Sequence, residues 1–450
     1  MQNIGEPSLE DIIRHGGNGQ QRQGESMLDM FANHNRSRQS RSLMDNPNMA
    51  SLVVSAMVFG EDESTNGLIR EGINRQWLSD TFGEWSFRRP DAARIRGEYL
   101  LGFCQETDAP VGINPDEVHF LVCAASGKGK TSLFKNLIRQ HIDAGERILA
   151  FDFENEYRHV LNDSRINYLG LDDLKFNPLE VPPGMKPSRY RQMFCAVLSD
   201  VLGLLVGSKS YLNNTIKRLY QIYGVNDGGN TYPSLFELAD LLVERMSNTK
   251  SNTREYSYLE TCLNRIQGFI DAFEDVVDCS SGMPFHVLTE SNLVVELHGA
   301  DFEYQSLMVN LMLVWLCCYR ISNGLRNNPE HNLAVFIDEA QRLFDIQQER
   351  RPYQGVPTIS HLVATVRKYN LKLFVAAQQP SLLASSIAAN AFAKLQMPLG
   401  HGNDIMSMST SQFLDEDQTR YARLLGTGEA IVKLSDRWTE PFVIRIPYEE

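Results

Sequence analysis

Residues 124–131 read AASGKGKT, and they stand between a short apolar run (FLVC) and a segment with helical spacing (TSLFKNLIRQHIDA). A glycine-rich loop that joins a strand to a helix can turn its backbone N–H groups toward an anion at the positive end of the helix. The next strand-like segment, RILAFDF, completes a strand–helix–strand unit, which requires a covered parallel sheet. The sequence therefore predicts an α/β fold that carries a phosphate-binding loop.

This loop follows the pattern GxxxxGK[ST] except at Ala124, which stands where the first glycine usually lies. Gly127 and Gly129 still allow the backbone to curl around phosphate oxygens. We expect Lys130 to neutralise the β- and γ-phosphates of ATP and the Thr131 hydroxyl to coordinate Mg²⁺. The alternative is a loop rich in glycine and lysine that matches by chance. The residues expected to contact ATP are Ser126, Gly127, Lys128, Gly129, Lys130, Thr131 and Ser132.

A second apolar run, LAVFIDEA, ends in the acids Asp338 and Glu339. The carboxyl ends of buried strands are where α/β sheets hold their ligands. We expect Asp338 to support Mg²⁺ through its water shell and Glu339 to polarise the attacking water. An acidic helix start would explain one acid, but not an acid pair downstream of a phosphate loop. The two motifs together predict ATP hydrolysis.

Two polar residues flank a third apolar run, LKLFVAAQQP. Gln378 ends this run, so its amide should lie near the γ-phosphate and sense hydrolysis. The alternative is a polar strand end before a turn. Arg367 precedes the run, and a guanidinium can reach transferring phosphate from a neighbouring subunit. A surface arginine is as consistent with the pattern, and for the second candidate, Arg437, the surface role is favoured.

Two further segments leave alternatives open. Asp152 and Glu154 end the strand RILAFDF, where they could tune the Mg²⁺ shell, contact the next subunit, or simply be solvated. Residues 347–355 combine Arg350 and Arg351 with Tyr353 in QQERRPYQG, a composition that suits a loop tracking a nucleic-acid strand. A solvated loop is at least as consistent with that composition.

The spacing of apolar residues divides the chain into four parts. Residues 1–97 form a poorly defined arm or assembly region, since residues 1–50 are rich in Gln, Asn, Ser, Arg and Gly. Residues 98–180 form the first part of the core and begin with an expected hairpin at 98–113. Residues 181–290 show helical spacing and form an insertion. The strand–helix alternation then returns in residues 291–450.

Bulk properties limit the environment and the partners of the chain. A net charge of −13 argues against a protein that simply coats nucleic acid, although it permits a local basic channel. Seven cysteines without CxxC spacing indicate free, mostly buried thiols in a reducing cytoplasm. No run of about 18 apolar residues is present, so we expect no membrane span. The apolar stretch at 311–318 is short enough for a buried helix.

Several segments together resemble the HerA/FtsK superfamily of hexameric DNA-pumping ATPases, and HerA-like proteins in particular. The likeness covers about residues 98–450 and includes YLLGF…DAPVGI, HFLVCAASGKGKTSL, ILAFDFENEY, FNPLE, AVFIDEAQRLF, RKYNLKLFVAAQQPS and LGTGEAIVKL…PFVIRIP. It implies a RecA-like core with a helical insertion, ATP and Mg²⁺, a closed ring, and double-stranded DNA in the central pore. It also implies that Asp338 and Glu339 are the Walker B pair, that Gln378 is the sensor, and that Arg367 acts between subunits.

The chain departs from this family at two places. Ala124 replaces a glycine, and residues 1–97 do not show the regular short strands of the N-terminal β-barrel of HerA. Rings without that barrel resemble those paired with other nucleases or effectors in bacterial anti-phage systems. The resemblance leaves two alternatives to a DNA motor, an ATP-gated scaffold ring and a conjugative secretion ATPase. Intact Glu339 and Gln378 favour turnover over a scaffold.

Overall fold

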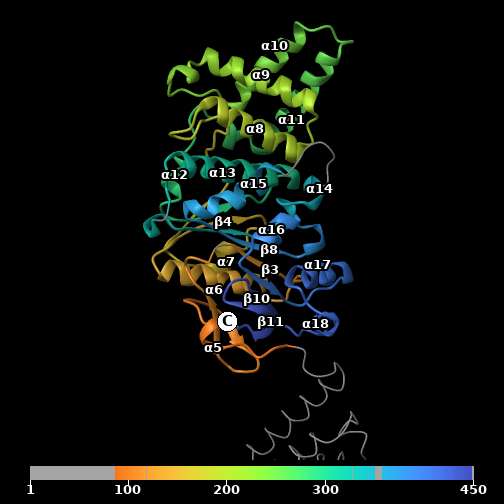
Figure 1. Ribbon diagram of the computed structural model, residues 1–450. Coiled ribbons are helices and arrows are strands. Elements are labelled where there is room, and N and C mark those ends of the chain that lie inside the picture. Colours follow the sequence, from red (N-terminus) through yellow and green to blue (C-terminus); the bar gives the residue numbers. More distant parts are fainter. Residues whose placement is uncertain (1–86, 118, 327, 350–356, 448–450) are drawn as a thin grey trace, which may run out of the picture. The chain divides into compact units, whose positions relative to one another are not determined.

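The structure is a computed structural model, and it describes residues 87–447 apart from residues 118, 327 and 350–356. These residues belong to one compact unit that begins at Phe87 (Figure 1). The predicted arm at 1–97 therefore falls almost wholly outside the described residues. So does the segment that carries Arg350, Arg351 and Tyr353.

The described strands form one sheet in the order β2-β1-β11-β10-β9-β3-β8-β7-β4-β6-β5. The seven strands from β9 to β5 are parallel to one another, which confirms the predicted α/β core. The strands are β1 Tyr99–Cys104, β2 Pro110–Ile113, β3 Phe120–Cys123, β4 Arg147–Asp152, β5 Ile166–Leu169, β6 Asn292–Glu296, β7 Leu333–Ile337, β8 Leu371–Ala377, β9 Ala393–Gln396, β10 Glu429–Leu434 and β11 Trp438–Arg445.

The central strands β3, β7 and β8 are buried along their whole length. Continuous apolar runs such as FLVC and LAVFI are typical of a parallel sheet that is covered on both faces. Cys123 pairs with Ala377, and Ile337 pairs with Val375, so the three strands end at the same edge. The loops that follow these strands therefore meet at one place.

The other side of the sheet is antiparallel. β1 and β2 form the hairpin that the sequence predicts at 98–113, and β11 pairs with both β1 and β10. β10 also pairs with β9 and so joins the antiparallel strands to the parallel ones. β9 separates β10 from β3, the strand that leads into the phosphate loop.

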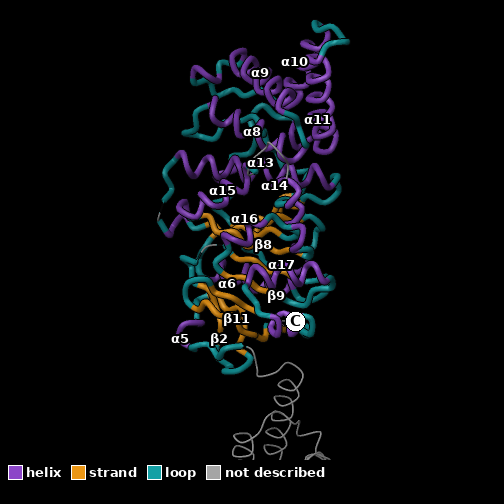
Figure 2. Tube along the Cα trace, turned by 45° about the vertical axis from the view of Figure 1, so that its right-hand side comes forward, coloured by secondary structure: helices purple, strands orange, loops and turns teal. Residues whose placement is uncertain are grey.

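Helices cover the sheet and also form a separate layer (Figure 2). Those beside the sheet strands are α5 Ala92–Ile95, α6 Lys130–Asp143, α7 Tyr157–Leu161, α13 Phe302–Ser322, α14 Ile346–Glu349, α15 Thr358–Val366, α16 Ser385–Asn390, α17 Gly402–Gln412 and α18 Glu416–Ala422. Short 3-10 turns are η2 Val225–Asp227, η3 Pro329–His331, η4 Ala340–Arg342, η5 Arg367–Tyr369 and η6 Pro380–Leu382.

A run of helices interrupts the sheet between β5 and β6, as the sequence predicts. They are α8 Pro187–Leu202, α9 Val206–Ile222, α10 Leu235–Ser247, α11 Arg254–Val277 and α12 Phe285–Leu288. Ser234 and Glu237 form a capping box that fixes the start of α10. In both views, α9, α10 and α11 lie beyond α8, on its far side from the sheet (Figures 1 and 2).

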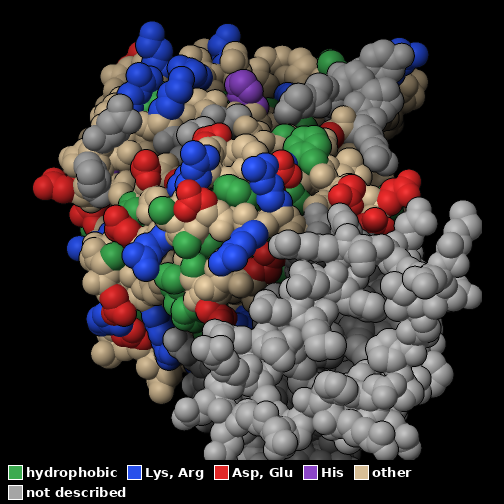
Figure 3. Space-filling view, turned by 60° about the horizontal axis from the view of Figure 1, so that its bottom comes forward, with side chains coloured by type: hydrophobic (Ala, Val, Ile, Leu, Met, Phe, Trp, Pro, Cys, Tyr) green, Lys and Arg blue, Asp and Glu red, His purple; other side chains and the backbone are tan. Residues whose placement is uncertain are grey.

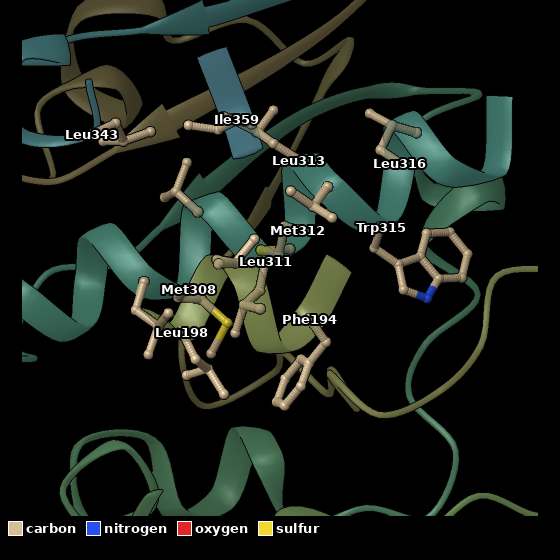
Figure 4. Close-up of a cluster of buried hydrophobic side chains, with 14 of the residues drawn as sticks. Phe194, Leu198, Met308, Leu311, Met312, Leu313, Trp315, Leu316, Leu343 and Ile359 are labelled. Carbon is tan, nitrogen blue, oxygen red and sulfur yellow. The ribbon is translucent and has the colours of Figure 1, made fainter. Parts of the chain in front are cut away.

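α13 is the long buried helix that the sequence indicates. It packs against α8 on one side and α15 on another, and Figure 4 shows Phe194 and Leu198 of α8 facing its apolar side chains. Among the described helices, it alone has the length and hydropathy of a membrane span, and 83% of that apolar window is buried inside the protein. Its apolar character on all sides is explained by this position between the sheet and the inserted helices.

The seven cysteines are all free, and six of them are buried. Burial raises the pKa of several of these thiols, including that of Cys262 to about 12. They are therefore inert packing residues, as the sequence indicates.

Candidate active site

The phosphate loop adopts the backbone conformation that its glycines allow. Gly127 and Gly129 have φ of 70° and 97°, in the left-handed region, and α6 begins directly after them at Lys130. Ala124 is not among the residues with positive φ, and its N–H donates to the carbonyl of Ala377 at 3.1 Å. Because that position continues the sheet pairing, an alanine fits there without strain.

Asp338 and Glu339 meet the loop lysine at the shared edge of the sheet. The Nζ of Lys130 lies 2.6 Å from Oδ1 of Asp338 and 2.7 Å from Oε1 of Glu339. Lys130 and Glu339 are both buried. Glu339 has a φ of 49°, an uncommon backbone conformation for a residue that is not glycine. Two carboxylates therefore share one ammonium here.

The amide of Gln378 completes this group. Its Nε2 donates to Oε1 of Glu339, while Nε2 of Gln341 donates to Oε2 of Glu339 at 2.7 Å. β7 and β8 are neighbours, so the residue after each strand reaches the other directly. The sequence predicted that Gln378 lies near the γ-phosphate, and the structure brings its amide to the carboxylate of Glu339.

These residues line one cavity of about 480 Å³. All seven predicted loop contacts face it, together with Asp338, Glu339 and Gln378. Its remaining walls include residues that the sequence analysis did not single out: Tyr157, Met397, Thr427, Gly428, Ile446 and Pro447. The segments LGTGEA and PFVIRIP, which form part of the family resemblance, were the available signal for the last four.

Burial and the shared ammonium shift the protonation of this group. Burial lowers the pKa of Lys130, but the two carboxylates outweigh it and the pKa is raised. Burial raises the pKa of Asp338, and Lys130 offsets only part of that effect. Burial acts on Glu339 too, but Lys130 and the donated hydrogen bonds hold the pKa of Glu339 below its usual value. Glu339 is therefore ionised at neutral pH.

Asp152 is not the solvated carboxylate that one interpretation of the sequence allowed. It is buried, and it accepts hydrogen bonds from the backbone N–H groups of Glu154, Glu156 and Tyr157 at 3.2, 3.2 and 2.8 Å. It thereby holds the turn after β4 against the cavity. Glu154 is more exposed, and its Oε1 lies 3.6 Å from Nη2 of Arg342.

The structure describes the side chain of only one of the two arginines that the sequence offers as contacts to phosphate. Arg367 begins η5, one turn before β8, and its side chain is not among those that the structure describes. Arg437 donates to the carbonyls of Arg96 and Gly112 and pairs with Glu117. These contacts tie Arg437 to the β1–β2 hairpin, so its role is structural.

The donor set fits a magnesium nucleotide. Thr131 and Asp338 both line the cavity, and Mg²⁺ is usually held by one or two such oxygens together with phosphates and water. Among residues 87–447, with their gaps, no group of three or more His, Cys, Asp or Glu side chains could hold a metal alone. The phosphates of a nucleotide would therefore supply the remaining ligands.

Comparison with known proteins agrees with this geometry. Residues 99–313 match the family model described as helicase HerA, central domain. The DNA double-strand break repair helicase HerA of Sulfolobus acidocaldarius is 22% identical over 352 residues, which are 76% of this chain and 67% of the relative. Protein TraC of Escherichia coli is 36% identical over 247 residues, 53% of this chain and 27% of TraC. The chain thus spans about two thirds of the length of its HerA relative.

Two solved structures share the fold. VirB4 of Thermoanaerobacter pseudethanolicus has a TM-score of 0.62 at 20% identity, covering 78% of this chain and 97% of that one. The plasmid coupling protein TrwB in complex with ADP and Mg²⁺ has a TM-score of 0.57 at 15% identity, covering 82% and 97%. The loop, the acid pair and the amide around one cavity make this chain an ATP hydrolase with a phosphate-binding loop, and it is similar to the HerA-like P-loop ATPases.

Proposed function

We propose that this ATPase is a DNA translocase that pumps double-stranded DNA for a separate nuclease or effector. The observation that carries the proposal is the intact group around Glu339, where an ionised carboxylate, Lys130 and Gln378 meet in one cavity. A scaffold that only binds ATP has no need for a positioned general base. HerA relatives named as DNA repair helicases supply the substrate class.

In this proposal, ATP lies on the loop 126–132, and Lys130 neutralises its β- and γ-phosphates. Thr131 would coordinate Mg²⁺ and Asp338 would support it through its water shell, and the ion would neutralise charge at the transferring phosphate. Glu339 orients the attacking water and accepts its proton. Gln378 holds Glu339 and the water in register, because its amide already contacts the carboxylate.

We further propose that the active species is a closed hexameric ring. Residues 98–180 and 291–450 would form its ATPase core, 181–290 its insertion and 1–97 an assembly region. Arg367 from one subunit would complete the site of the next, since it lies directly before the sensor strand. Mixing Arg367→Ala subunits with Glu339→Gln subunits should restore part of the ATPase activity, and no recovery in verified mixed rings would contradict an action in trans.

DNA contacts are proposed for the pore of that ring, with Arg350 and Arg351 as candidates. The net charge of −13 argues against a protein that coats DNA. On the face in Figure 3, Lys and Arg side chains stand among Asp and Glu side chains rather than in one basic surface. We also propose that the protein is cytoplasmic and that it acts in anti-phage defence.

The test is ATPase activity with and without double-stranded DNA, over a range of salt concentrations. A translocase should be stimulated by DNA, and the stimulation should fall steeply with salt. A scaffold ring should hydrolyse ATP at a rate that DNA does not change. The second candidate is a conjugative secretion ATPase, favoured by the 36% identity to TraC. Displacement of a third strand bound to linear duplex DNA would favour the translocase over that candidate.

A further inference from the structure

Arg342 lies beside Glu339, and the sequence analysis gave Arg342 no role. It ends the short turn η4, three residues after Glu339. Its Nε lies 3.9 Å from Oε2 of Glu339, and its Nη2 lies 3.6 Å from Oε1 of Glu154. Its guanidinium carbon lies 4.3 Å from the ring centroid of Phe302, at the start of α13. The guanidinium is thus held between two carboxylates and an aromatic face.

The cavities around Glu339 show from which direction Arg342 contacts its carboxylate. Glu339 and Gln378 line both the nucleotide cavity and a second cavity of about 790 Å³. Arg342 lines only the second cavity. Ser126 and Glu154 also line both cavities. Arg342 therefore reaches Glu339 from the second cavity and is not part of the wall of the nucleotide cavity.

The two oxygens of the Glu339 carboxylate have different partners. Oε1 accepts from Lys130 and Gln378, which line the nucleotide cavity. Oε2 accepts from Gln341 and faces Arg342. The second oxygen is thus held from behind, which leaves the first directed at the place where a water would be activated.

We propose that Arg342 is a positioning residue that holds Glu339 in place for water activation. The reason is competition for Lys130, because the phosphates of ATP attract the same ammonium that now contacts Glu339. Once Lys130 turns to phosphate, Arg342 remains as the cation beside the carboxylate. It stays in place because its N–H donates to the carbonyl of Glu339 at 2.9 Å, its carbonyl accepts from Ser306 at 3.0 Å, and its side chain lies on Phe302. This inference rests on the proposed role of Glu339 as the base.

The experiment measures ATP turnover of Arg342→Ala, Arg342→Gln and Arg342→Lys. We expect Arg342→Ala to lower kcat roughly 10- to 100-fold, the scale of a misplaced catalytic group, with KM for ATP changed less than about threefold. Arg342→Lys should recover part of the loss because it keeps the charge, and Arg342→Gln should not.

Arg245 in α10 is a matched control. Its side chain is 28% exposed against 27% for Arg342, it lies 3.7 Å from Glu255, and it faces the ring of Tyr211. Arg245→Ala should leave kcat and KM for ATP unchanged, because this arginine lies in the inserted helices. Equal losses in the two alanine variants would show a general effect on folding and would overturn the proposal.

Glu339→Gln, measured in parallel, separates the two ideas. If Glu339→Gln is inactive while Arg342→Ala turns over at the wild-type rate, only the role of Arg342 is wrong. If Glu339→Gln is fully active, the assignment of the base is wrong. A raised KM with unchanged kcat in Arg342→Ala would make Arg342 a nucleotide contact and would also overturn the proposal. If Arg342→Ala does not fold, the Lys and Gln variants decide by the same criteria.

Discussion

Two buried ionic clusters lie at opposite ends of the same three elements. The phosphate-edge cluster consists of Lys130, Asp338, Glu339 and Gln378. The opposite-edge cluster consists of His141, Glu146, Asn332 and Lys372. α6 runs from Lys130 toward His141, β7 lies between Asn332 and Asp338, and β8 lies between Lys372 and Gln378. Each element therefore contributes to both clusters, and Glu146, which lies between α6 and β4, completes the opposite-edge cluster.

The clusters differ in charge balance and in access. At the opposite edge, a single carboxylate, Glu146, is satisfied by Nδ1 of His141 at 2.7 Å, by Nζ of Lys372 at 2.6 and 2.9 Å, and by Asn332 at 2.8 Å. His141 is fully buried, and its ring lies 4.0 Å from that of Tyr99. At the phosphate edge, two carboxylates share one ammonium beside a cavity. The phosphate-edge cluster, with two carboxylates for one ammonium beside a cavity, is suited to bind a ligand. The opposite-edge cluster, whose one carboxylate is fully partnered and buried, is suited to fix how the strands and helix pack.

The largest effect that this comparison predicts is on turnover. Glu339→Gln keeps the shape of the phosphate-edge cluster but removes the base, so kcat for ATP should fall at least about 100-fold. ATP binding should persist because Lys130 and Asp338 remain. Steady-state ATPase assays with a nucleotide-binding titration check both points. Near-normal turnover in this variant would place the base elsewhere.

Glu146→Ala should have the converse phenotype. It leaves Lys372 and His141 buried without their partner, and breaking such a pair costs about 3–5 kcal/mol of the free energy of unfolding. Affinity for ATP should stay near the wild-type value, since the change is at the far end of the strands. Chemical denaturation and an ATP titration of the folded variant test this. A loss of ATP affinity with unchanged stability would reverse the roles that we give to the clusters.

Acid should lower the free energy of unfolding that the opposite-edge cluster contributes, because Glu146 becomes protonated. Burial alone would raise the pKa of Glu146, but the hydrogen bond from His141 and the charge of Lys372 outweigh it and lower the pKa from 4.5 to about 2. A lowered folded-state pKa stabilises the protein above pH 4.5, and this contribution, about 3 kcal/mol, is lost as the pH falls toward 2. Urea denaturation should therefore show the stability gap between wild type and Glu146→Gln narrowing over that interval. A constant gap would contradict the lowered pKa.

The sequence revealed the two clusters to very different degrees. The phosphate edge was predictable because Lys130, Asp338 and Gln378 each follow an apolar strand, in motifs whose spacing has a chemical meaning. The opposite edge was not, because Glu146 and Lys372 belong to no motif whose spacing has a chemical meaning. A lysine within LKLFVAA looks like a solvated residue on an edge strand until β8 is placed between β3 and β7.

The same reasoning explains which other features could be predicted from the sequence and which could not. The β1–β2 hairpin and the buried helix α13 were predicted because their signals are local and periodic. Arg342 was passed over because nothing in AQRLF shows that a short turn folds its side chain back onto Glu339. The sequence left the role of Asp152 open between a Mg²⁺ shell, a subunit contact and a solvated carboxylate, because its partners are backbone N–H groups, which leave no mark in the sequence.

The most direct test of the division between the clusters is ATP binding by two matched lysine variants. Lys130 and Lys372 are both buried, and each contacts carboxylate oxygen at 2.6 Å. Isothermal titration of wild type, Lys130→Ala and Lys372→Ala with MgATP compares them, with circular dichroism to verify folding. We predict that Lys130→Ala loses ATP binding while folded Lys372→Ala retains it. Tight ATP binding by a folded Lys130→Ala variant would contradict the account.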